Sequence, residues 1–361
     1  MNRNPVLRVL VIDDSAFSRQ TITRMLERSP LVEVVGLARD GEEALRKTLE
    51  LAPDLVTLDL EMPRMNGFTF LRLVMSKAPT PVIVISSRFA EGNVFKALEL
   101  GAVDFVAKPR ARAAVELEQI EAELIRKVHG IRELRIEKVS DRITSVQPVV
   151  TRRVDRREGL APVVVMGAST GGPAALMQIF SAFADVPECS FLVVQHMPPG
   201  FTRGFAERLN RLTPFNVKEA ETGDTPSAGA VFIVPAGKHV ELDTRGSQNV
   251  LRLDANAGGE RYVPSVDRLF SSAAKAYGKD MLAIVLTGMG DDGAKGACQV
   301  KQAGGRVIAE SEETAVIYGM PKQVVNLGVA DEVLPLNEIP AAVQRGLDGL
   351  SSSGSLSRGE K

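Results

Sequence analysis

The sequence has few of the residues that cross-link a chain, anchor it in a membrane or give it a strong charge. It has only two cysteines, Cys189 and Cys298, too few for a disulfide framework or a cysteine metal cluster, which predicts a reducing, cytoplasmic location. Lysine and arginine number 44 against 45 acidic residues, so a net charge of −1 offers no bulk attraction to nucleic acid or membranes. No apolar run approaches the roughly 18 residues that a membrane helix needs. We therefore expect no nucleic-acid binding and no direct membrane insertion.

The length and the order of apolar segments predict two α/β domains. A chain of 361 residues is long for one hydrophobic core. The first part alternates five apolar strands with helical patterns, and strands this apolar are typical of a parallel sheet with helices on both faces. The predicted strands are residues 7–12, 32–37, 55–60, 81–86 and 104–107. An arginine-rich stretch with little apolar periodicity then interrupts the alternation.

Strand–helix alternation restarts after this stretch and predicts a second, mostly parallel, doubly wound domain. Glycine-rich and proline-rich short strands between residues 218 and 253 indicate a β-rich insertion in it. The main predicted strands are residues 162–166, 190–195, 231–234, 280–286 and 306–309. The predicted boundaries are 1–130 for the first domain, 131–160 for the linker, 161–350 for the second domain and 351–361 for a disordered tail.

Five polar residues follow the predicted strands of the first domain. Asp13 and Asp14 follow the first strand, Asp59 lies at the end of the third, and Ser86 and Lys108 lie at the ends of the fourth and fifth. The carboxyl ends of parallel strands share one edge of a sheet, so these side chains are expected to meet. Three carboxylates repel each other unless a cation neutralises them, and their oxygens suit Mg²⁺. The lysine and the hydroxyl can then stabilise a phosphoryl group on one carboxylate. Each acidic residue alone could instead be a helix cap.

Residues 5–125 resemble the receiver domains of response regulators, which implies a flavodoxin-like sheet of five parallel strands. By that resemblance Asp59 is the phospho-acceptor, and Lys108 is the phosphate-sensing lysine. Ser86 and Phe105 correspond to the hydroxyl and aromatic switch pair. The implied Mg²⁺ ligands are Asp13, Asp14, Asp59 and the Glu61 backbone carbonyl. The sequence departs from the pattern at Asn66, where an aspartate is usual, but asparagine also caps helices well.

The second domain opens with a serine on a predicted strand-to-helix turn. The six residues Gly167-Ala168-Ser169-Thr170-Gly171-Gly172 follow the apolar run 163–166 and fit the G-x-S-x-G pattern of an exposed nucleophile. Backbone N–H groups at the following helix start can stabilise an oxyanion, so this turn predicts acyl-transfer chemistry. A glycine-rich turn of this kind also binds phosphate in many α/β proteins. A non-catalytic output domain that binds a ligand or a partner is therefore the alternative.

A serine nucleophile needs a base, and the chain has only three histidines. His196 ends the apolar strand 190–195, one β-α unit after the serine, and is the preferred base. We expect His129 to be solvated on a helix and His239 to be structural or substrate-lining. An orienting carboxylate is expected after the strand 280–286, where Asp291 and Asp292 are adjacent and either could be a helix cap.

Three segments of the second domain resemble the chemotaxis methylesterases, the protein-glutamate methylesterase/glutaminases. They are Gly-Ala-Ser-Thr-Gly-Gly, Gln-His-Met-Pro-Pro-Gly-Phe and Leu-Thr-Gly-Met-Gly-Asp-Asp-Gly. The resemblance implies that Ser169 is the nucleophile, His196 the general base and Asp292 the orienting carboxylate. It also implies that the Met289 backbone N–H holds the oxyanion, that Thr170 supports the site, and that hydrolysis needs no cofactor. The order Ser–His–Asp differs from that of the α/β-hydrolases.

Together the two resemblances imply a cytoplasmic, monomeric hydrolase controlled by phosphorylation. It would release methanol from glutamate methyl esters of methyl-accepting chemoreceptors and deamidate glutamines on them. A chemotaxis histidine kinase would donate the phosphoryl group, and Mg²⁺ in the receiver would assist that transfer.

Overall fold

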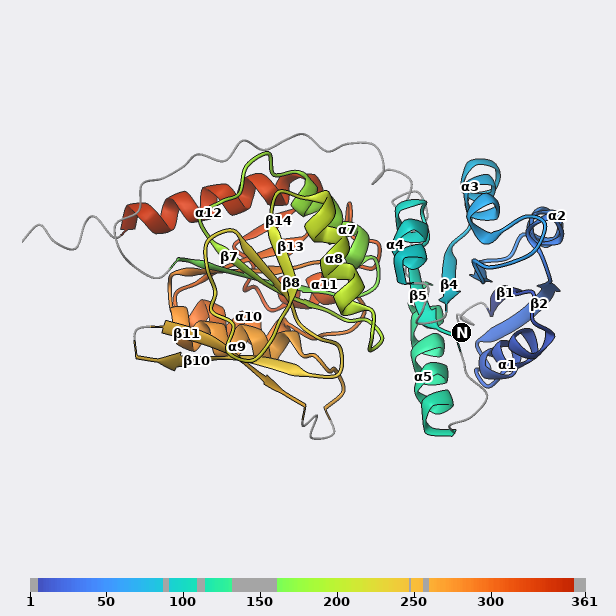
Figure 1. Ribbon diagram of the computed structural model, residues 1–361, viewed down its shortest axis with the longest axis horizontal. Coiled ribbons are helices and arrows are strands. Elements are labelled where there is room, and N and C mark those ends of the chain that lie inside the picture. Colours follow the sequence, from blue (N-terminus) through green and yellow to red (C-terminus); the bar gives the residue numbers. More distant parts are fainter. Residues whose placement is uncertain are drawn as a thin grey trace, which may run out of the picture. The chain divides into compact units, whose positions relative to one another are not determined.

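The computed structural model of the chain divides into two compact units, before and after the boundary between residues 144 and 145. It describes residues 6–86, 91–108, 114–131, 161–246, 248–255 and 260–353. Each unit is an α/β fold built on a parallel sheet, as predicted (Figure 1). The predicted linker lies outside the described residues except for residue 131. Of the predicted tail, residues 351–353 belong to the last helix, which ends at Ser353, and residues 354–361 lie outside the described residues.

The N-terminal unit is a five-stranded parallel sheet in the order β2-β1-β3-β4-β5. Its strands are β1 (Leu7–Ile12), β2 (Val32–Ala38), β3 (Leu55–Leu58), β4 (Val82–Ser86) and β5 (Asp104–Ala107). Its helices are α1 (Ala16–Glu27), α2 (Gly41–Leu51), α3 (Gly67–Lys77), α4 (Glu91–Glu99) and α5 (Ala114–Gly130). All residues of β3, β4 and β5 are buried, which explains their continuous apolar runs.

Side-chain caps fix where several of these helices begin. The Ser15 side chain accepts from the Ser18 amide at the start of α1, and Asp40 accepts from two amides at the start of α2. The Asn66 oxygen accepts from the Thr69 amide at 3.0 Å and caps α3. Asparagine therefore serves as the cap at this position, as the sequence indicated.

The C-terminal unit is a seven-stranded parallel sheet in the order β14-β13-β12-β6-β7-β9-β8, with a separate antiparallel hairpin. The sheet strands are β6 (Val163–Ala168), β7 (Ser190–Gln195), β8 (Asn216–Glu219), β9 (Ala230–Ile233), β12 (Met281–Val285), β13 (Arg306–Glu310) and β14 (Glu332–Leu334), and the hairpin is β10 (His239–Arg245) and β11 (Gln248–Asp254). The helices are α7 (Gly172–Ser181), α8 (Thr202–Leu212), α9 (Val266–Tyr277), α10 (Ala294–Gln302), α11 (Met320–Asn326) and α12 (Ile339–Ser353), with a 3₁₀ turn η3 (Leu336–Glu338).

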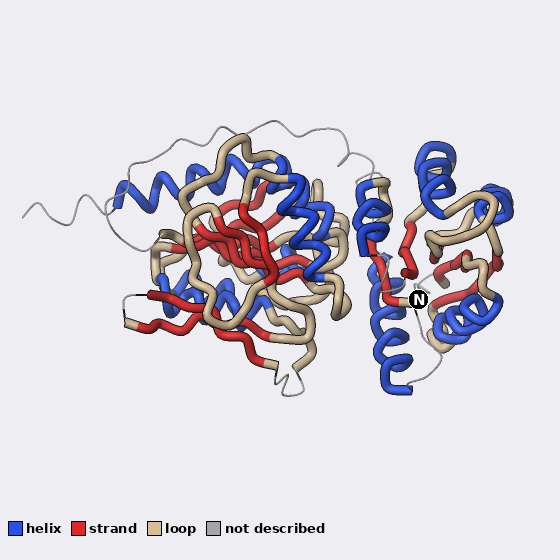
Figure 2. The backbone as a smooth tube through the Cα atoms, viewed as in Figure 1, coloured by secondary structure: helices blue, strands red, loops and turns tan. Residues whose placement is uncertain are grey.

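Helices cover both faces of this sheet, and the hairpin extends the layer that contains α9 and α10 (Figures 1 and 2). One continuous apolar core joins the sheet to this layer and includes Leu192 of β7, Val240 of β10 and Phe270 of α9. The hairpin is the β-rich insertion that the sequence predicted, and it buries one face against α9.

The strand order places a topological switch point at β6. From β6 the chain continues to β7 on one side, and later returns through β12 to pair with the other side of β6. Ligand sites in open α/β sheets lie outside the carboxyl ends of strands at such a point. The three segments that carry the predicted triad therefore follow three adjacent strands.

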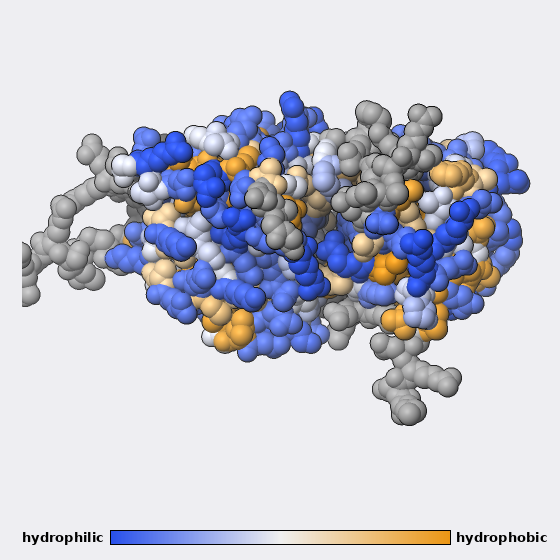
Figure 3. Space-filling model, turned by 90° about the horizontal axis from the view of Figure 1, so that it is seen from below, coloured by the Kyte–Doolittle hydropathy of each residue, from blue (hydrophilic) through white to orange (hydrophobic). Residues whose placement is uncertain are grey.

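The coloured part of the face shown in Figure 3 is largely hydrophilic, with small apolar patches. The exposed large apolar side chains come from separate elements, for example Phe17 of α1 and Leu212 of α8. None of the helices in the described part of the chain combines the length and the apolar character that a bilayer crossing requires.

Candidate functional site

Ser169 lies in the turn between β6 and α7 and is buried to 4% exposure. The turn is tight because it contains glycines where side chains would not fit. Gly171 has a φ of +78°, a left-handed conformation that favours glycine, and a Cβ there would be 2.8 Å from Val316. A Cβ on Gly288, in the loop after β12, would be 2.7 Å from the Ser169 Cβ. The loop after β12 therefore packs directly against the serine.

Two buried polar side chains hold the backbone of this turn. The Ser169 amide donates to the Thr287 carbonyl at 3.0 Å, and the Thr287 hydroxyl donates to the Thr170 carbonyl at 2.9 Å. From the other side, the Gln195 side-chain amide donates to the Ser169 carbonyl at 2.8 Å and to the His196 carbonyl at 2.9 Å. The serine turn is thus tied to the ends of both neighbouring strands.

His196 follows β7 and faces the segment after β12. Its Nε2 is 2.9 Å from Oδ2 of Asp292, and both side chains are buried. Its Nδ1 is buried and has no hydrogen-bond partner among the described residues. If Asp292 is ionised, the proton of a neutral imidazole lies on Nε2 and Nδ1 keeps its lone pair. Nδ1 is then the nitrogen able to take a proton from Ser169, the reverse of the usual assignment in serine proteases.

The Asp292 carboxylate is surrounded by hydrogen-bond donors. Oδ2 also accepts from the Val266 amide at 2.8 Å, and Oδ1 accepts from the Asp267 amide at 2.9 Å and the Ser265 hydroxyl at 3.1 Å. Burial alone would raise its pKa, but the hydrogen bond from His196 and these backbone amides outweigh burial and hold the pKa below its usual value. The carboxylate is therefore charged at neutral pH.

Of the two adjacent aspartates, only Asp292 faces the imidazole. The side chain of Asp291 is 60% exposed and lies 3.8 Å from the Arg261 guanidinium. It also accepts a long hydrogen bond of 3.4 Å from the Tyr262 hydroxyl. Asp291 thus belongs to the rim of the site.

The loop after β12 provides a free backbone donor beside the serine. Within the described residues, the Met289 amide donates no hydrogen bond to the protein. Its neighbour Gly288 is the residue that packs against Ser169. An unpaired N–H beside a nucleophile can hold the oxyanion of a tetrahedral intermediate. Thr170, also predicted to support the site, is buried and bonded through its carbonyl to Thr287.

The other two histidines have different partners among the described residues. His129 is half-buried in α5 and lies 2.8 Å from the Ser29 hydroxyl, so the expectation of a solvated side chain is wrong. The partner is 100 positions away in sequence, so no local pattern could reveal it. His239 is fully buried, and burial lowers its pKa. It lies 3.5 Å from Glu260, which fits a structural role.

Sequence reasoning missed Tyr262, whose ring stacks on the His196 imidazole. The ring centroids are 5.0 Å apart and the ring planes differ by 5°. Thr287 and Gln195 were not singled out either. The last two could have been found, since they lie inside the motifs that contain Gly288 and His196, whereas nothing in the sequence marks Tyr262.

In the N-terminal unit, the three predicted carboxylates do converge. Ligand atoms of Asp13, Asp14 and Asp59 lie within 4.8 Å of one another. The Lys108 ammonium is 2.6 Å from Asp59 and 2.9 Å from Asp13. Burial raises the pKa of Asp13, more than the Lys108 charge lowers it. Burial alone would lower the pKa of Lys108, but the two carboxylates raise it overall, so the lysine stays charged.

This oxygen-rich cluster fits a hard divalent cation. The buried Asp13 oxygen Oδ2 is close to Lys108 but has no well-aligned hydrogen bond among the described residues. Mg²⁺ takes carboxylate oxygens together with waters and phosphate oxygens, so these three side chains can hold it. The backbone of Glu61 lies beside the cluster, since its amide donates a long 3.4 Å hydrogen bond to Asp59. Its carbonyl as a ligand remains a prediction.

The predicted switch residues lie at the same end of the sheet. Ser86 is buried at the end of β4, and its carbonyl accepts from the Lys108 amide at 2.7 Å. The Phe105 ring is buried, edge-on to Phe95 of α4, with the Lys127 ammonium 5.2 Å from its centroid. Phe105 therefore points into the unit rather than into solvent.

Comparison with known proteins agrees with this division of the chain. The CheB methylesterase family matches residues 164–343, and the response regulator receiver domain family matches residues 9–119. A protein-glutamate methylesterase/protein-glutamine glutaminase of Geobacter sulfurreducens is 49% identical over 353 residues, covering 92% of this chain and 95% of the relative. One of Pyrococcus abyssi is 40% identical over 360 residues, covering 98% and 96%. The crystal structure of the Thermotoga maritima CheB methylesterase catalytic domain is 42% identical, with a TM-score of 0.50, and covers 52% of this chain and 99% of that domain.

Proposed function

Because this chain belongs to the protein-glutamate methylesterase/protein-glutamine glutaminase family, we propose that Ser169, His196 and Asp292 are its catalytic triad. The observation that carries this proposal is the 2.9 Å contact between His196 Nε2 and a charged, buried Asp292, in segments that follow strands on either side of the serine strand. The earlier alternative, a non-catalytic output domain, is wrong, since the family is one of enzymes.

In the proposed reaction, the Ser169 hydroxyl attacks the side-chain carbonyl of a glutamate methyl ester on a chemoreceptor. His196 takes the serine proton at Nδ1, and Asp292 stabilises the imidazolium that forms. The Met289 amide and the positive end of α7 stabilise the oxyanion. His196 then protonates the departing methoxide, and methanol leaves. Water, deprotonated by the same imidazole, hydrolyses the acyl-enzyme and releases glutamate.

The same groups support the glutaminase reaction. With a glutamine substrate, His196 donates its proton to the leaving nitrogen and ammonia departs in place of methanol. The acyl-enzyme is identical, so both substrates yield glutamate. Neither reaction requires a cofactor at Ser169.

The receiver unit supports control of this activity by phosphorylation. Asp59 would accept a phosphoryl group from a chemotaxis histidine kinase, and Asp13 and Asp14 would hold Mg²⁺, which neutralises charge during the transfer. The new phosphate carries about two negative charges and offers oxygens to Lys108 and Ser86. A coupling of about 1–3 kcal/mol between this event and the catalytic unit would change activity roughly 5- to 150-fold.

Removal of the nucleophile tests the proposed triad. Methanol release from methylated receptor membranes should fall about 10³-fold or more in Ser169→Ala. A serine-directed phosphonylating reagent should label the wild-type protein at Ser169 and leave this variant unlabelled. If Ser169→Ala released methanol at close to the wild-type rate, the triad assignment would have to be abandoned. Activity of wild type on other methylated proteins, with none on chemoreceptors, would instead redirect the substrate assignment.

A further inference from the structure

The stack of Tyr262 on His196 has no place in the triad chemistry described so far. The two rings are almost parallel, with their centroids 5.0 Å apart. Tyr262 is half-buried and His196 is nearly buried, so the phenol ring covers one face of the imidazole. The hydroxyl of Tyr262 makes a 3.4 Å contact with exposed Asp291.

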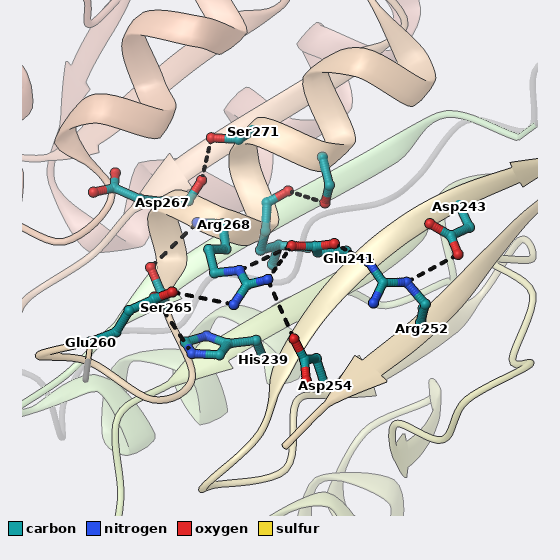
Figure 4. A network of polar contacts seen from close by, with 12 residues as sticks. His239, Glu241, Asp243, Arg252, Asp254, Glu260, Ser265, Asp267, Arg268 and Ser271 are labelled. Carbon is teal, nitrogen blue, oxygen red and sulfur yellow. Dashed lines mark hydrogen bonds and ion pairs between the residues drawn. The ribbon is translucent and has the colours of Figure 1, made fainter. Parts of the chain in front are cut away.

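The segment 260–266, which carries Tyr262, is fixed at both of its ends. At its start, Glu260 lies 3.3 Å from the Arg268 guanidinium and 3.5 Å from buried His239, as Figure 4 shows. At its end, the Ser265 hydroxyl and the Val266 amide donate to Asp292. The tyrosine is thus placed by contacts with three elements: α9, the hairpin strand β10 and the loop after β12.

Arg268 is the centre of the anchor at the start of the segment. Besides Glu260, it is bonded to Glu241 of β10 and lies 3.7 Å from Asp254 of β11 (Figure 4). Three carboxylates around one guanidinium hold it in place, and they tie the hairpin to α9. Residues 260–266 therefore carry Tyr262 between two anchored ends.

From this geometry we propose that Tyr262 is a positioning residue for the catalytic imidazole and acts through the face of its ring. The stack limits rotation of His196 about its side-chain bonds, so Nε2 stays on Asp292 and Nδ1 stays free to receive the serine proton. The electron-rich face also favours the imidazolium that forms when the serine proton is transferred. That stabilisation is greater in the transition state than in the resting enzyme, so it raises kcat rather than substrate affinity.

The proposal rests on the triad described above and is tested with two replacements of the same residue. Tyr262→Phe keeps the ring and removes the hydroxyl, whereas Tyr262→Leu keeps apolar bulk and removes the aromatic face. We expect the leucine variant to lose about fivefold or more in kcat for methanol release, with KM within twofold of wild type. The phenylalanine variant should keep at least half of the wild-type kcat. If phenylalanine were as damaging as leucine, or if leucine changed KM alone, the ring-face proposal would be wrong.

A spectroscopic signature separates positioning from a general loss of structure. The chain has three histidines, so selectively labelled imidazole signals can be assigned with one substitution at each. The ring current of Tyr262 should shift the His196 signals upfield in wild type and in Tyr262→Phe, and this shift should disappear in Tyr262→Leu. The signals of His129 and His239 should stay in place. Unshifted His196 signals in wild type would overturn the stack itself.

The anchor provides an independent check. Glu260→Ala removes the contact with Arg268 but leaves the ring, and it should lower kcat in the same direction as Tyr262→Leu, by a smaller factor. If Glu260 acts through the ring, the double variant should be no slower than Tyr262→Leu alone. Additive losses would show that the anchor and the ring act separately. Finally, Ser169→Ala distinguishes the two proposals: an active Ser169→Ala refutes the triad, whereas an inactive one with an unaffected Tyr262→Leu refutes only the positioning role.

Discussion

Replacing Asp292 by asparagine tests the electrostatic core of the site with a minimal change of shape. The carboxylate accepts four hydrogen bonds: from His196 Nε2, from the Val266 and Asp267 amides and from the Ser265 hydroxyl. An asparagine has one oxygen, so its NH₂ group must face at least one backbone N–H, whichever way the amide lies. One buried donor then loses its acceptor, which costs about 1–3 kcal/mol of stability.

The effect on catalysis depends on which side the NH₂ group occupies. If it faces His196, the imidazole must carry its proton on Nδ1 and can no longer accept one from Ser169, which predicts a loss of roughly 10³–10⁴-fold in kcat. If the oxygen faces His196, the tautomer survives but the negative charge that stabilises the imidazolium is gone, a loss of about 1.5–3 kcal/mol, or roughly 10- to 150-fold. Either orientation leaves one backbone amide without an acceptor: that of Val266 if the NH₂ group faces His196, and that of Asp267 if the NH₂ group faces Ser265, whose hydroxyl can rotate to accept.

Methanol release from methylated receptor membranes measures kcat, and the rate of Ser169 phosphonylation reports the nucleophile directly. Asp291→Asn is the matched control, since it makes the same chemical change at the neighbouring, 60% exposed side chain, and it should stay within about threefold of wild type. The stability loss should also depend on pH. The pKa of Asp292 is held below its unfolded value, so the carboxylate stabilises the fold above about pH 4 and this contribution disappears as the pH falls through the folded pKa. This reasoning would be refuted if Asp292→Asn kept more than a tenth of the wild-type kcat. It would also be refuted if Asp292→Asn and Asp291→Asn lost the same factor in kcat.

Three further predictions concern the oxyanion donor and the receiver unit. Met289→Pro, which removes the backbone N–H, should lower kcat about 10²- to 10³-fold, whereas Met289→Ala, which keeps it, should stay close to wild type; equal effects would exclude the amide as the donor. Asp59→Asn should abolish stimulation by a small-molecule phosphodonor and leave unstimulated methanol release intact; retained stimulation would place the phosphorylation elsewhere. Burial raises the pKa of Asp13, so this carboxyl loses its proton at a lower pH in the unfolded chain than in the folded one. The stability of the receiver unit therefore decreases as the pH rises from about 4 through the pKa of Asp13 in the folded state. Millimolar Mg²⁺ at pH 7 should therefore raise the thermal midpoint of wild type but not of Asp13→Asn, and an equal rise in both would rule out this carboxylate as a ligand.

The sequence was most informative where strands are fully buried and short turns follow them. The predicted bounds of β1, β5 and β7 match the structure to the residue. β3 ends at Leu58, two residues earlier than predicted, since the apolar Leu60 lies beyond the last sheet pairing. The short elements α11 and β14, of seven and three residues, were not predicted, because neither is long enough to show a period.

In the candidate site too, the sequence indicated some residues and gave no sign of others. Ser169, His196 and Asp292 could be proposed because each follows an apolar strand, and the ends of parallel strands meet at one edge. That β6 lies between β7 and β12, which brings the three together, is a property of the sheet order and is not written in any local pattern. Tyr262 reaches His196 from a segment 66 positions away that has no motif of its own.

Asp267 and Asp292 lie at the start of α9 and hold two helices in place. Asp292, a proposed triad residue, can therefore have a structural role and a catalytic role at once. An acidic residue just before Gly293 was expected to be able to cap the helix that begins there. Instead, Asp292 accepts from the first two amides of the neighbouring helix α9, beside the N-cap Ser265, while Asp267 of α9 accepts from the Gly293 and Gly296 amides at the start of α10. The two helix starts are therefore tied together by an aspartate of α9 and by an aspartate of the loop that precedes α10. Burial, together with the nearby charge of Asp292, raises the pKa of Asp267, whereas His196 helps to keep the pKa of Asp292 low. The hydrogen bonds that tie the two helix starts together therefore also fix the Asp292 carboxylate that contacts the imidazole.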